Sequence, residues 1–274
     1  MVDFPTGKKH VSYSEVKCWK ECPYRHKLKH IDKIDLSKPS PYLDFGINVH
    51  EGCENYLLSK SIPKERLLEN IRSAWKEHGF DDPDWVKVQP GWYKYHSVDE
   101  WCNWADNMWS DVPGFLDETF QDWETVSAEE QLYEDVDGKN IFFKGFIDAI
   151  IKVPQKNGKY KYWILDWKTA KRYGWDSRKK RDKTIQYQIV LYKHFWAEKN
   201  NIPLKDINCG FILLKRGGKP GNMCELYQVS SGEKTIERAK KMVSNMVTSV
   251  RRGLSLKNRD SCMFCEYYKT EHCV

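Results

Sequence analysis

The sequence Gly145-Phe-Ile-Asp148 is followed by Asp166-Trp-Lys168 and then by Gln188-Ile-Val-Leu-Tyr192. Both acidic residues follow apolar residues, where a carboxylate is costly unless it is paired or bound to a cation. Asn157-Gly158 between them is a hairpin signal, so the two acids are expected on neighbouring strands. Paired carboxylates suit Mg²⁺, and a lysine beside them can position a metal-bound water for phosphodiester hydrolysis. On chemistry alone, an ion pair between Lys168 and either acid explains the pattern equally well.

The surrounding sequence predicts an α/β core. Strands are expected at 126–135, 141–153 and 160–167, joined by hairpins at Asp137-Gly138 and Asn157-Gly158. A helix should then run from about 183 to 199, followed by strands at 207–215 and 224–229 on either side of a turn at 217–222. Ser230-Ser-Gly-Glu233 is expected to cap a last helix that reaches about residue 252.

The residues before 124 predict helices. Ser12-Tyr-Ser-Glu15 is a capping-box pattern, so a helix should run from Tyr13 to about Ile31, with a disturbance at Pro23. A second helix should begin near Phe45 and carry His50 and Glu54 on one face. Helices are also expected at 63–78 and 98–111, with a loop at 81–97. We therefore expect one integrated domain, made of a helical portion (1–123), an α/β core (124–252) and a cysteine-rich tail (253–274).

Composition limits the classes of function. The 274 residues are 40% hydrophobic and carry a net charge of +6, which permits a core and hints at an anionic partner. No apolar run approaches the about 20 residues of a membrane helix, and no signal segment is apparent, so an intracellular chain without membrane contact is expected. No Walker-type phosphate loop occurs, so any DNA unwinding would come from a partner.

The nine cysteines fall into two groups. Three of them crowd the last thirteen residues, and Cys18 and Cys22 lie four apart near the N-terminus. In a chain without a secretory signal, clustered cysteines bind metal more often than they form disulfides. The remaining cysteines, which stand singly in apolar stretches, are expected to be buried free thiols: Cys53, Cys102, Cys209 and Cys224.

The ordered set Gly-x-x-Asp, Asp-x-Lys, Gln-x-x-x-Tyr resembles the RecB-type branch of the PD-(D/E)xK nuclease superfamily. Phe45-Gly46-Ile-Asn-Val-His50-Glu looks like the Gly-x-x-x-His element of that branch. Ser12-Tyr-Ser, with Cys22-Pro-Tyr-Arg, resembles the N-terminal element of its iron–sulfur, exonuclease-like members. Each motif alone is weak, but together they keep the family's order over nearly the whole chain. The resemblance implies an α/β, restriction-endonuclease-like core with a mixed central sheet flanked by helices.

The resemblance also implies roles for the matching residues. Mg²⁺ or Mn²⁺ would be held by Asp148, Asp166, the carbonyl of Trp167 and His50. Lys168 would orient the attacking water, and Gln188 and Tyr192 would organise the site. From the sequence alone, His50 is more simply an ordinary helix histidine. A glutamate is also expected on the first strand, and alternation points only one of Glu129 and Glu130 inward. Glu129 is favoured slightly, because Leu132 three residues later fits the usual pattern of the family.

The cysteine cluster resembles the [4Fe–4S] ligand set of the iron–sulfur members. The implied ligands are Cys22, Cys262, Cys265 and Cys273. Cys273 follows Cys265 by eight positions, whereas the family commonly has about six, so structural Zn²⁺ remains an alternative and His272 could replace Cys273. Cys18 could compete with Cys22, but the Pro-Tyr pair follows Cys22 only.

A basic segment directly follows the Asp-x-Lys strand. Runs of charge are commonly solvated loops, but this position favours contact with DNA phosphates. The implied DNA-binding residues are Arg172, Arg178, Lys179, Lys180 and Arg181. A second, weaker basic cluster comprises Arg251, Arg252, Lys257 and Arg259.

These features predict a metal-dependent DNA exonuclease that acts on single strands or duplex ends in recombination, repair or phage DNA processing. A helicase or recombination protein is a conceivable partner, and the expected location is the cytoplasm of a bacterial or phage-infected cell. Two alternatives stay open: a structure-selective endonuclease with the same site, and a non-catalytic DNA-binding module that retains the fold.

Overall fold

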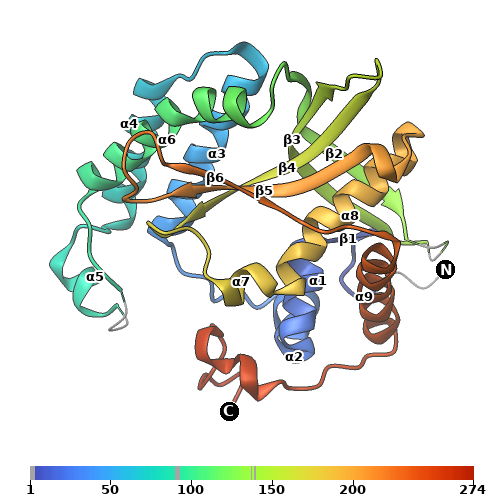
Figure 1. Ribbon diagram of the computed structural model, residues 1–274. Helices are drawn as coiled ribbons and strands as arrows, with labels where there is room; N and C mark the ends of the chain where they lie inside the picture. Colours follow the sequence, from blue (N-terminus) through green and yellow to red (C-terminus); the bar gives the residue numbers. More distant parts are fainter. Residues whose placement is uncertain (1–3, 90–92, 137, 139) are drawn as a thin grey trace.

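The computed structural model describes residues 4–89, 93–136, 138 and 140–274, in which six strands form one mixed sheet (Figure 1). The strands are β1 (His10–Ser12), β2 (Glu124–Asp135), β3 (Phe142–Pro154), β4 (Tyr160–Ala170), β5 (Ile207–Lys215) and β6 (Cys224–Gln228). Their order is β1-β3-β4-β5-β6, and β2 also pairs with β3. The predicted mixed central sheet is confirmed.

Strand directions follow from the connections. β2, β3 and β4 are successive antiparallel strands, as the hairpin signals predict. β4 and β5 are parallel, because the helical segment between them carries the chain back across the sheet. This pairing extends to Ala170 and Lys215, so β4 runs three residues beyond the predicted end at Trp167. β1, which the sequence did not predict, is a three-residue strand parallel to the start of β3.

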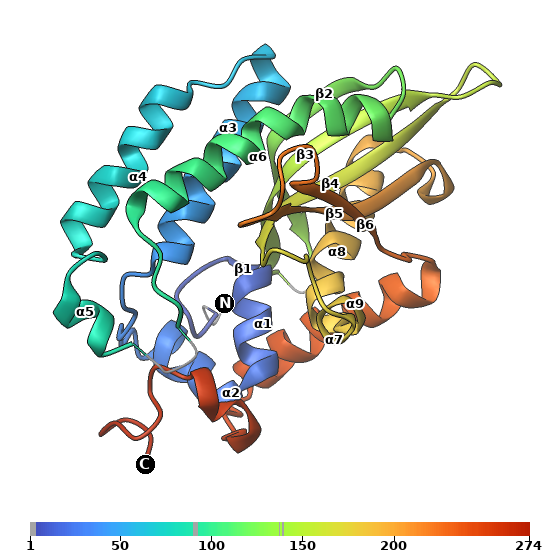
Figure 2. The ribbon, with the colours of Figure 1, turned by 60° about the vertical axis from the view of Figure 1, so that its left-hand side comes forward.

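Helices cover both faces of the sheet (Figures 1 and 2). One face packs against α1 (Tyr13–Glu21), α8 (Lys183–Asn200) and α9 (Glu233–Arg251). The other packs against α3 (Pro41–Ser59), α4 (Lys64–His78) and α6 (Val98–Thr119). Successive β4 residues alternate between these two cores, with Ile164 under α8 and Leu165 and Trp167 on the α3 and α6 side.

Close packing of α3 against α6 depends on Gly52. A Cβ at this position would lie 2.2 Å from Trp109 Nε1, so any side chain here would collide with the indole ring. The same indole N–H donates a hydrogen bond to the Val49 carbonyl at 3.1 Å. Helix α3, which carries His50, is thus fixed against α6 by a contact that needs glycine.

The first helical segment breaks where proline predicts. Helix α1 ends at Glu21, and α2 (Pro23–His26) and a π-helical turn (Lys27–Ile31) continue the chain. Ser12 Oγ accepts a hydrogen bond from Glu15 N at 3.3 Å, so the N-cap prediction is confirmed. The Glu15 carboxylate does not complete the capping box, because it lies 3.0 Å from Nε2 of the buried His26.

Other element boundaries differ from the predictions. Helix α3 begins at Pro41 rather than near Phe45, because proline is favoured in the first turn of a helix. Helix α6 continues past residue 111 to Thr119, with Pro113 inside it, since Val112 and Leu116 are fully buried. A short helix, α5 (Pro83–Lys87), lies within the predicted loop.

Turn predictions had mixed outcomes. The Asn157-Gly158 hairpin is confirmed, with Gly158 at a φ of +76°. Asp137 of the predicted Asp137-Gly138 turn lies outside the described residues, as do residues 90–92 of the predicted 81–97 loop. The Ser230–Glu233 capping prediction was wrong, because Gly232 is the N-cap of α9 and no side chain caps that helix.

Residues 253–274 return to the N-terminal helices (Figure 1). The Leu256 carbonyl accepts a hydrogen bond from Tyr24 N at 3.2 Å. Asn258, which precedes the short helix η3 (Arg259–Phe264), donates from Nδ2 to the Glu21 carbonyl at 2.7 Å. The two ends of the described chain are therefore joined. Within the described ranges, none of the helices has both the length and the apolar character that crossing a membrane requires.

Candidate active site

Asp148 and Asp166 meet where β3 and β4 separate. The antiparallel register of these strands runs up to Ala149 opposite Leu165, which places the next two residues, Asp148 and Asp166, opposite each other. Beyond this point the ladder stops, and Asp148 Oδ2 accepts a hydrogen bond from the backbone N–H of Trp167 at 2.8 Å. The local opening of the sheet thus brings two carboxylates from neighbouring strands together.

Lys168 lies beside this acidic pair. Its Nζ is 2.7 Å from Asp166 Oδ2, and the side chain is 31% exposed, so solvent reaches it. Burial alone would lower the pKa of Lys168, but the charges of Asp166 and Asp148 outweigh this effect and raise it. Lys168 therefore carries its positive charge within hydrogen-bonding distance of a buried carboxylate.

Both acids resist ionisation. Burial raises the pKa of Asp148 to about 7, although Lys168 and the Trp167 amide act in the opposite direction. Burial and then the charge of Asp148 raise the pKa of Asp166 to about 6. Asp166 is only 1% exposed, and its Oδ1 has no hydrogen-bond partner among the described residues. A buried carboxylate oxygen without a partner is costly, which makes it suited to a cation.

His50 approaches the same acids from α3. Its Nδ1 lies 3.4 Å from Asp148 Oδ2. Burial, and then the charge of Lys168, lower the pKa of His50 to about 4, so the imidazole is neutral at pH 7. A neutral imidazole is the form that can bind a metal.

The two candidate glutamates of β2 separate clearly. Glu130 Oε1 lies 3.0 Å from Lys199 of α8, and its other oxygen accepts a hydrogen bond from Ser127 Oγ at 2.6 Å. Glu129 falls between Ala128 and Glu130, which pair with Ala149 and Ile147, so it stands opposite Asp148. Burial, and then the charges of Glu54 and Asp166, raise the pKa of Glu129. The geometry brings Glu129 to the acidic pair and Glu130 to α8.

Glu54 of α3 is a further residue of this site that the sequence analysis did not select. Its charge contributes to the raised pKa of both Asp148 and Glu129. The available signal was its position one helical turn after His50, on the same face of the helix.

Gln188 and Tyr192 face each other across one turn of α8. Gln188 Nε2 donates a hydrogen bond to the Tyr192 hydroxyl at 3.3 Å. Burial, and then the charge of Asp166, raise the pKa of Tyr192 well above its ordinary value. The Tyr192 ring rests on Gly145, where a Cβ would lie 2.6 Å from ring atom Cε1. The glycine of Gly-x-x-Asp therefore makes room for this tyrosine.

The basic segment folds into a short helix, α7 (Ser177–Arg181), whose N-cap Asp176 accepts a hydrogen bond from Lys179 N at 2.8 Å. Lys180 lies 2.5 Å from the Glu225 carboxylate, so its charge is already paired. Lys179 Nζ lies 4.7 Å from the centroid of a Trp175 ring, and Arg172 is stacked over Tyr173. Of the five basic candidates, Lys180 is thus the one engaged with a carboxylate inside the fold.

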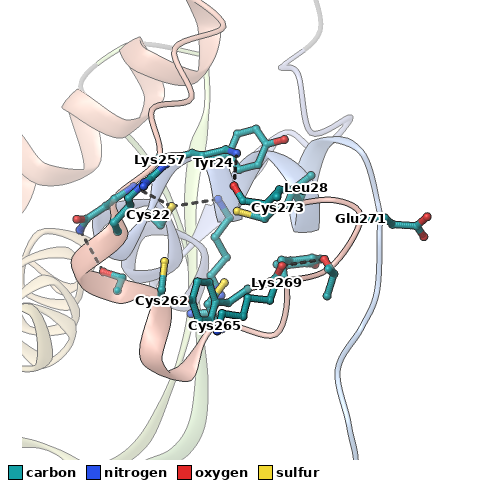
Figure 3. Close-up of a pocket in the computed structure, with 17 residues that line it drawn as sticks. Cys22, Tyr24, Leu28, Lys257, Cys262, Cys265, Lys269, Glu271 and Cys273 are labelled. Atoms are coloured by element: carbon teal, nitrogen blue, oxygen red, sulfur yellow. Dashed lines mark hydrogen bonds between the residues drawn. The ribbon is translucent and has the colours of Figure 1, made fainter.

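The four candidate cysteines line a single cavity of about 620 Å³ between α2 and the C-terminal segment (Figure 3). Cys22 Sγ accepts hydrogen bonds from Arg25 N at 3.5 Å and Asn258 N at 3.3 Å. The cavity lining includes Cys262, Cys265 and Cys273 but neither Cys18 nor His272. His272 instead contributes its carbonyl to a hydrogen bond from the Tyr24 hydroxyl at 3.1 Å.

The described residues do not form a ready-made metal site. In residues 4–89, 93–136, 138 and 140–274, no three His, Cys, Asp or Glu side chains converge closely enough to form a ready metal site. At the acidic pair, a cation would therefore take backbone oxygen and water in addition to Asp148 and Asp166, which is usual for Mg²⁺. The four cysteine side chains line the same cavity, but their thiols do not converge on one position.

Comparison with solved structures finds a similar fold in another protein. No curated protein sequence matches the chain. A protein from Eubacterium rectale designated "putative exonuclease" has the same fold, with a TM-score of 0.55 at 10% identity, covering 96% of this chain and 89% of that one. A second solved structure, SSO0001, gives a TM-score of 0.41 at 12% identity, covering 95% of this chain and 84% of the other.

The family model of the PD-(D/E)XK nuclease superfamily matches residues 10–270, from β1 into the cysteine-rich tail. The match spans the sheet that carries the acidic pair, as well as α3 and α8 on its two faces. With the strand order and the placement of Asp148, Asp166 and Lys168, it establishes that the chain belongs to the PD-(D/E)XK nuclease superfamily.

Proposed function

We propose that this chain is a metal-dependent DNA exonuclease that hydrolyses phosphodiester bonds in single strands or at duplex ends. Membership of a nuclease superfamily supports nuclease activity. The observation that carries the proposal is the juxtaposition of Asp148 and Asp166 with Lys168 Nζ 2.7 Å from Asp166. Two acids with raised pKa values and one retained ammonium group are the combination expected of a hydrolytic site.

The residues fit a hard divalent cation, Mg²⁺ or Mn²⁺. Asp148, Asp166 and the Trp167 carbonyl would supply oxygen ligands, and neutral His50 lies at the edge of the same site. The free Oδ1 of Asp166 is the observation that favours this assignment. A bound cation of this kind lowers the pKa of a water molecule and neutralises charge on the phosphate.

The protein side chains would then supply the remaining functions of the site. Lys168 would orient the attacking water and counter the charge of the scissile phosphate, since its ammonium is both charged and accessible. Glu129 and Glu54 would act on the site through their negative charges, which raise the pKa of Asp148. Gln188 and Tyr192 would support β3 from α8, through the contact of the tyrosine ring with Gly145.

The cysteine cavity fits a structural metal centre with thiolate ligands, and we propose a [4Fe–4S] cluster, with Zn²⁺ as the alternative. Two backbone N–H groups directed at Cys22 Sγ would stabilise a thiolate there. Arg25, Lys257 and Lys269 also line the cavity and favour negative charge. The colour of the purified protein separates the two metals, because iron–sulfur centres absorb visible light and zinc does not.

Digestion of end-labelled DNA tests the function. Purified protein with Mg²⁺ or Mn²⁺ should shorten linear single-stranded or duplex DNA from its ends and leave a closed circular substrate intact. Cleavage of the circle would favour the structure-selective endonuclease. Protein that binds DNA but leaves every substrate uncut would favour the non-catalytic module. We also propose a helicase or recombination protein as a partner, and a role in DNA repair or phage DNA processing. Interaction studies would test both.

A further inference from the structure

Arg216 occupies an unusual position at the end of β5. Its backbone N–H donates to the Ala170 carbonyl at 2.9 Å, which fixes it beside the end of β4. The guanidinium carbon lies 4.5 Å from the centroid of the Tyr42 ring and 5.1 Å from that of Trp101. The guanidinium therefore lies over rings from α3 and α6, in cation–π contacts.

The charge of Arg216 lacks an acidic partner. In the part of the chain that the structure describes, no carboxylate forms an ion pair with it, and its Nε is buried without a hydrogen-bond acceptor. Burial lowers the pKa of Arg216, and interaction with Tyr42 offsets part of this effect. Arg216 is partly buried and contacts Tyr42, but its Nε–H has no acceptor, which is costly in the free protein, and an anionic ligand would relieve that cost.

The position of Arg216 can be measured along two elements. On α3, Tyr42 and His50 are eight residues apart, which corresponds to about 12 Å along the helix axis. On the sheet, Lys168 pairs with Leu213, and Arg216 lies three residues further, which corresponds to about 10 Å. Both routes place the guanidinium within reach of a strand that extends a few nucleotides from a phosphate bound at Lys168.

Lys179 of α7 belongs to the same electrostatic neighbourhood. Its pKa is lowered by burial and then by the charges of Lys17, Lys168 and Arg216, and only Asp176 acts in the opposite direction. Lys179 therefore lies within electrostatic range of these three cations. Four cations gathered next to a proposed phosphodiester site favour the binding of a polyanion.

We propose that Arg216 forms a phosphate-binding subsite that holds the substrate strand a few nucleotides from the scissile bond. This inference rests on the proposed nuclease function and extends it to residues outside the acidic site. The planar guanidinium presents paired N–H donors that match phosphate oxygens, and the two aromatic rings keep it oriented before substrate arrives. Arg216 is thus a positioning residue for the strand.

The test uses binding of a fluorescent single-stranded oligonucleotide in EDTA, with salt concentration as the variable. Arg216→Gln should weaken binding about tenfold or more, because a charge-assisted hydrogen bond is lost. The slope of log K against log salt should decrease by about 0.7, the value of one phosphate contact on a single strand. Arg216→Lys should retain most of the slope but bind more weakly. The matched control is Arg238→Gln, which removes an exposed arginine from α9 and should leave both quantities within twofold of the unaltered protein.

Neutral methylphosphonate linkages, placed one at a time along the oligonucleotide, give an independent readout on the unaltered protein. A single neutral linkage a few nucleotides from the cut should reduce the affinity of the unaltered protein for the oligonucleotide. The same linkage should not further reduce the affinity of Arg216→Gln. With Mn²⁺, the variant should show a raised KM and a kcat changed by less than about threefold.

An unchanged salt slope, or full methylphosphonate sensitivity in Arg216→Gln, would overturn the subsite. If the unaltered protein shows the expected binding but never cleaves, the subsite stands and the nuclease function fails. Circular dichroism checks that the variants fold.

Discussion

The acidic site and the cysteine cavity both join residues far apart in the sequence, but the fold holds them by different means. Asp148, Asp166 and Lys168 project from paired strands of the central sheet, whose register fixes their spacing. Cys22 lies between α1 and α2 and Cys262 lies on η3, and hydrogen bonds and an ion pair join the C-terminal segment to the N-terminal helices. The difference teaches that strand pairing in the sheet positions the acidic site, whereas contacts between short segments from the two ends of the described chain position the cysteines.

The largest expected effect concerns activity alone. Asp166→Asn or Lys168→Ala should reduce DNA cleavage by roughly 10²–10⁴-fold, because each removes a group that would act at the reacting phosphate. Thermal unfolding should change little, since β4 keeps its neighbours on both sides. Cleavage of end-labelled DNA and a melting curve, measured on the same preparation, check both parts. Substantial remaining cleavage would place the chemistry elsewhere.

The next effect concerns stability. Cys22→Ser should release bound metal and lower Tm by several degrees or more, because metal bound to thiolates contributes folding energy. Cys18→Ser is the matched control, since Cys18 is buried four residues earlier but does not line the cavity. Metal content and Tm are the measurements. Equal losses in the two variants would mean that the cavity holds no metal of its own.

The neighbouring glutamates of β2 sharpen the comparison within one strand. Glu129→Gln should lower activity about tenfold or more, because Glu129 stands opposite Asp148 and interacts with its charge. Glu130→Gln should leave activity nearly unchanged and weaken the contacts with Lys199 and Ser127, of which the partly exposed ion pair contributes about 0.5 kcal/mol. Cleavage rates of the pair, compared side by side, decide the assignment, and a reversed order would contradict it.

A smaller effect is expected from packing behind the acids. Gly145→Ala places a Cβ 2.6 Å from Tyr192, an overpacking that costs about 1–3 kcal/mol and displaces β3. Gly114→Ala, in the open part of α6, should instead stabilise the protein by up to about 1 kcal/mol. Urea unfolding of both variants measures the difference. If Gly145→Ala were neutral, the tyrosine contact would not be fixing the strand.

The smallest effect is a dependence of metal-free stability on pH. The folded-state pKa of Asp148, about 7, is raised above its ordinary value of 3.8, so stability falls as pH rises through this range. Between pH 6.5 and 8 the loss should be below about 1 kcal/mol, and Asp148→Asn should remove most of it. Melting in EDTA at the two pH values checks this, and added Mg²⁺ should restore more stability at pH 8. A loss that persists in Asp148→Asn would assign it to other groups.

Much of the architecture could be predicted because local signals and tertiary structure agree. Hairpin residues between apolar strands fix β3 and β4, and the even spacing of strand residues brings Asp166 and Lys168 to one site. Long-range pairing could not be predicted in the same way. β1 has three residues and exists only through its contact with β3.

Side-chain placement shows the same limit. Whether Glu129 or Glu130 faces the acids depends on the register of β2 against β3, and nothing within β2 determines it. Arg216 is a lone basic residue at a strand end, and only its aromatic neighbours from α3 and α6 distinguish it. The cysteine spacing identified the residues that line the cavity, but the metal they would bind remains a prediction.

The central position of β4 has a consequence for motion. Because β4 is hydrogen-bonded to β3 on one side and β5 on the other, its backbone amides should exchange with deuterated water mainly through global opening of the domain. Local fluctuations would then seldom separate Asp166 from Lys168. Any adjustment to an incoming strand has to come from peripheral elements such as the five-residue α7, which makes that segment the place to look for altered exchange when nucleic acid is added.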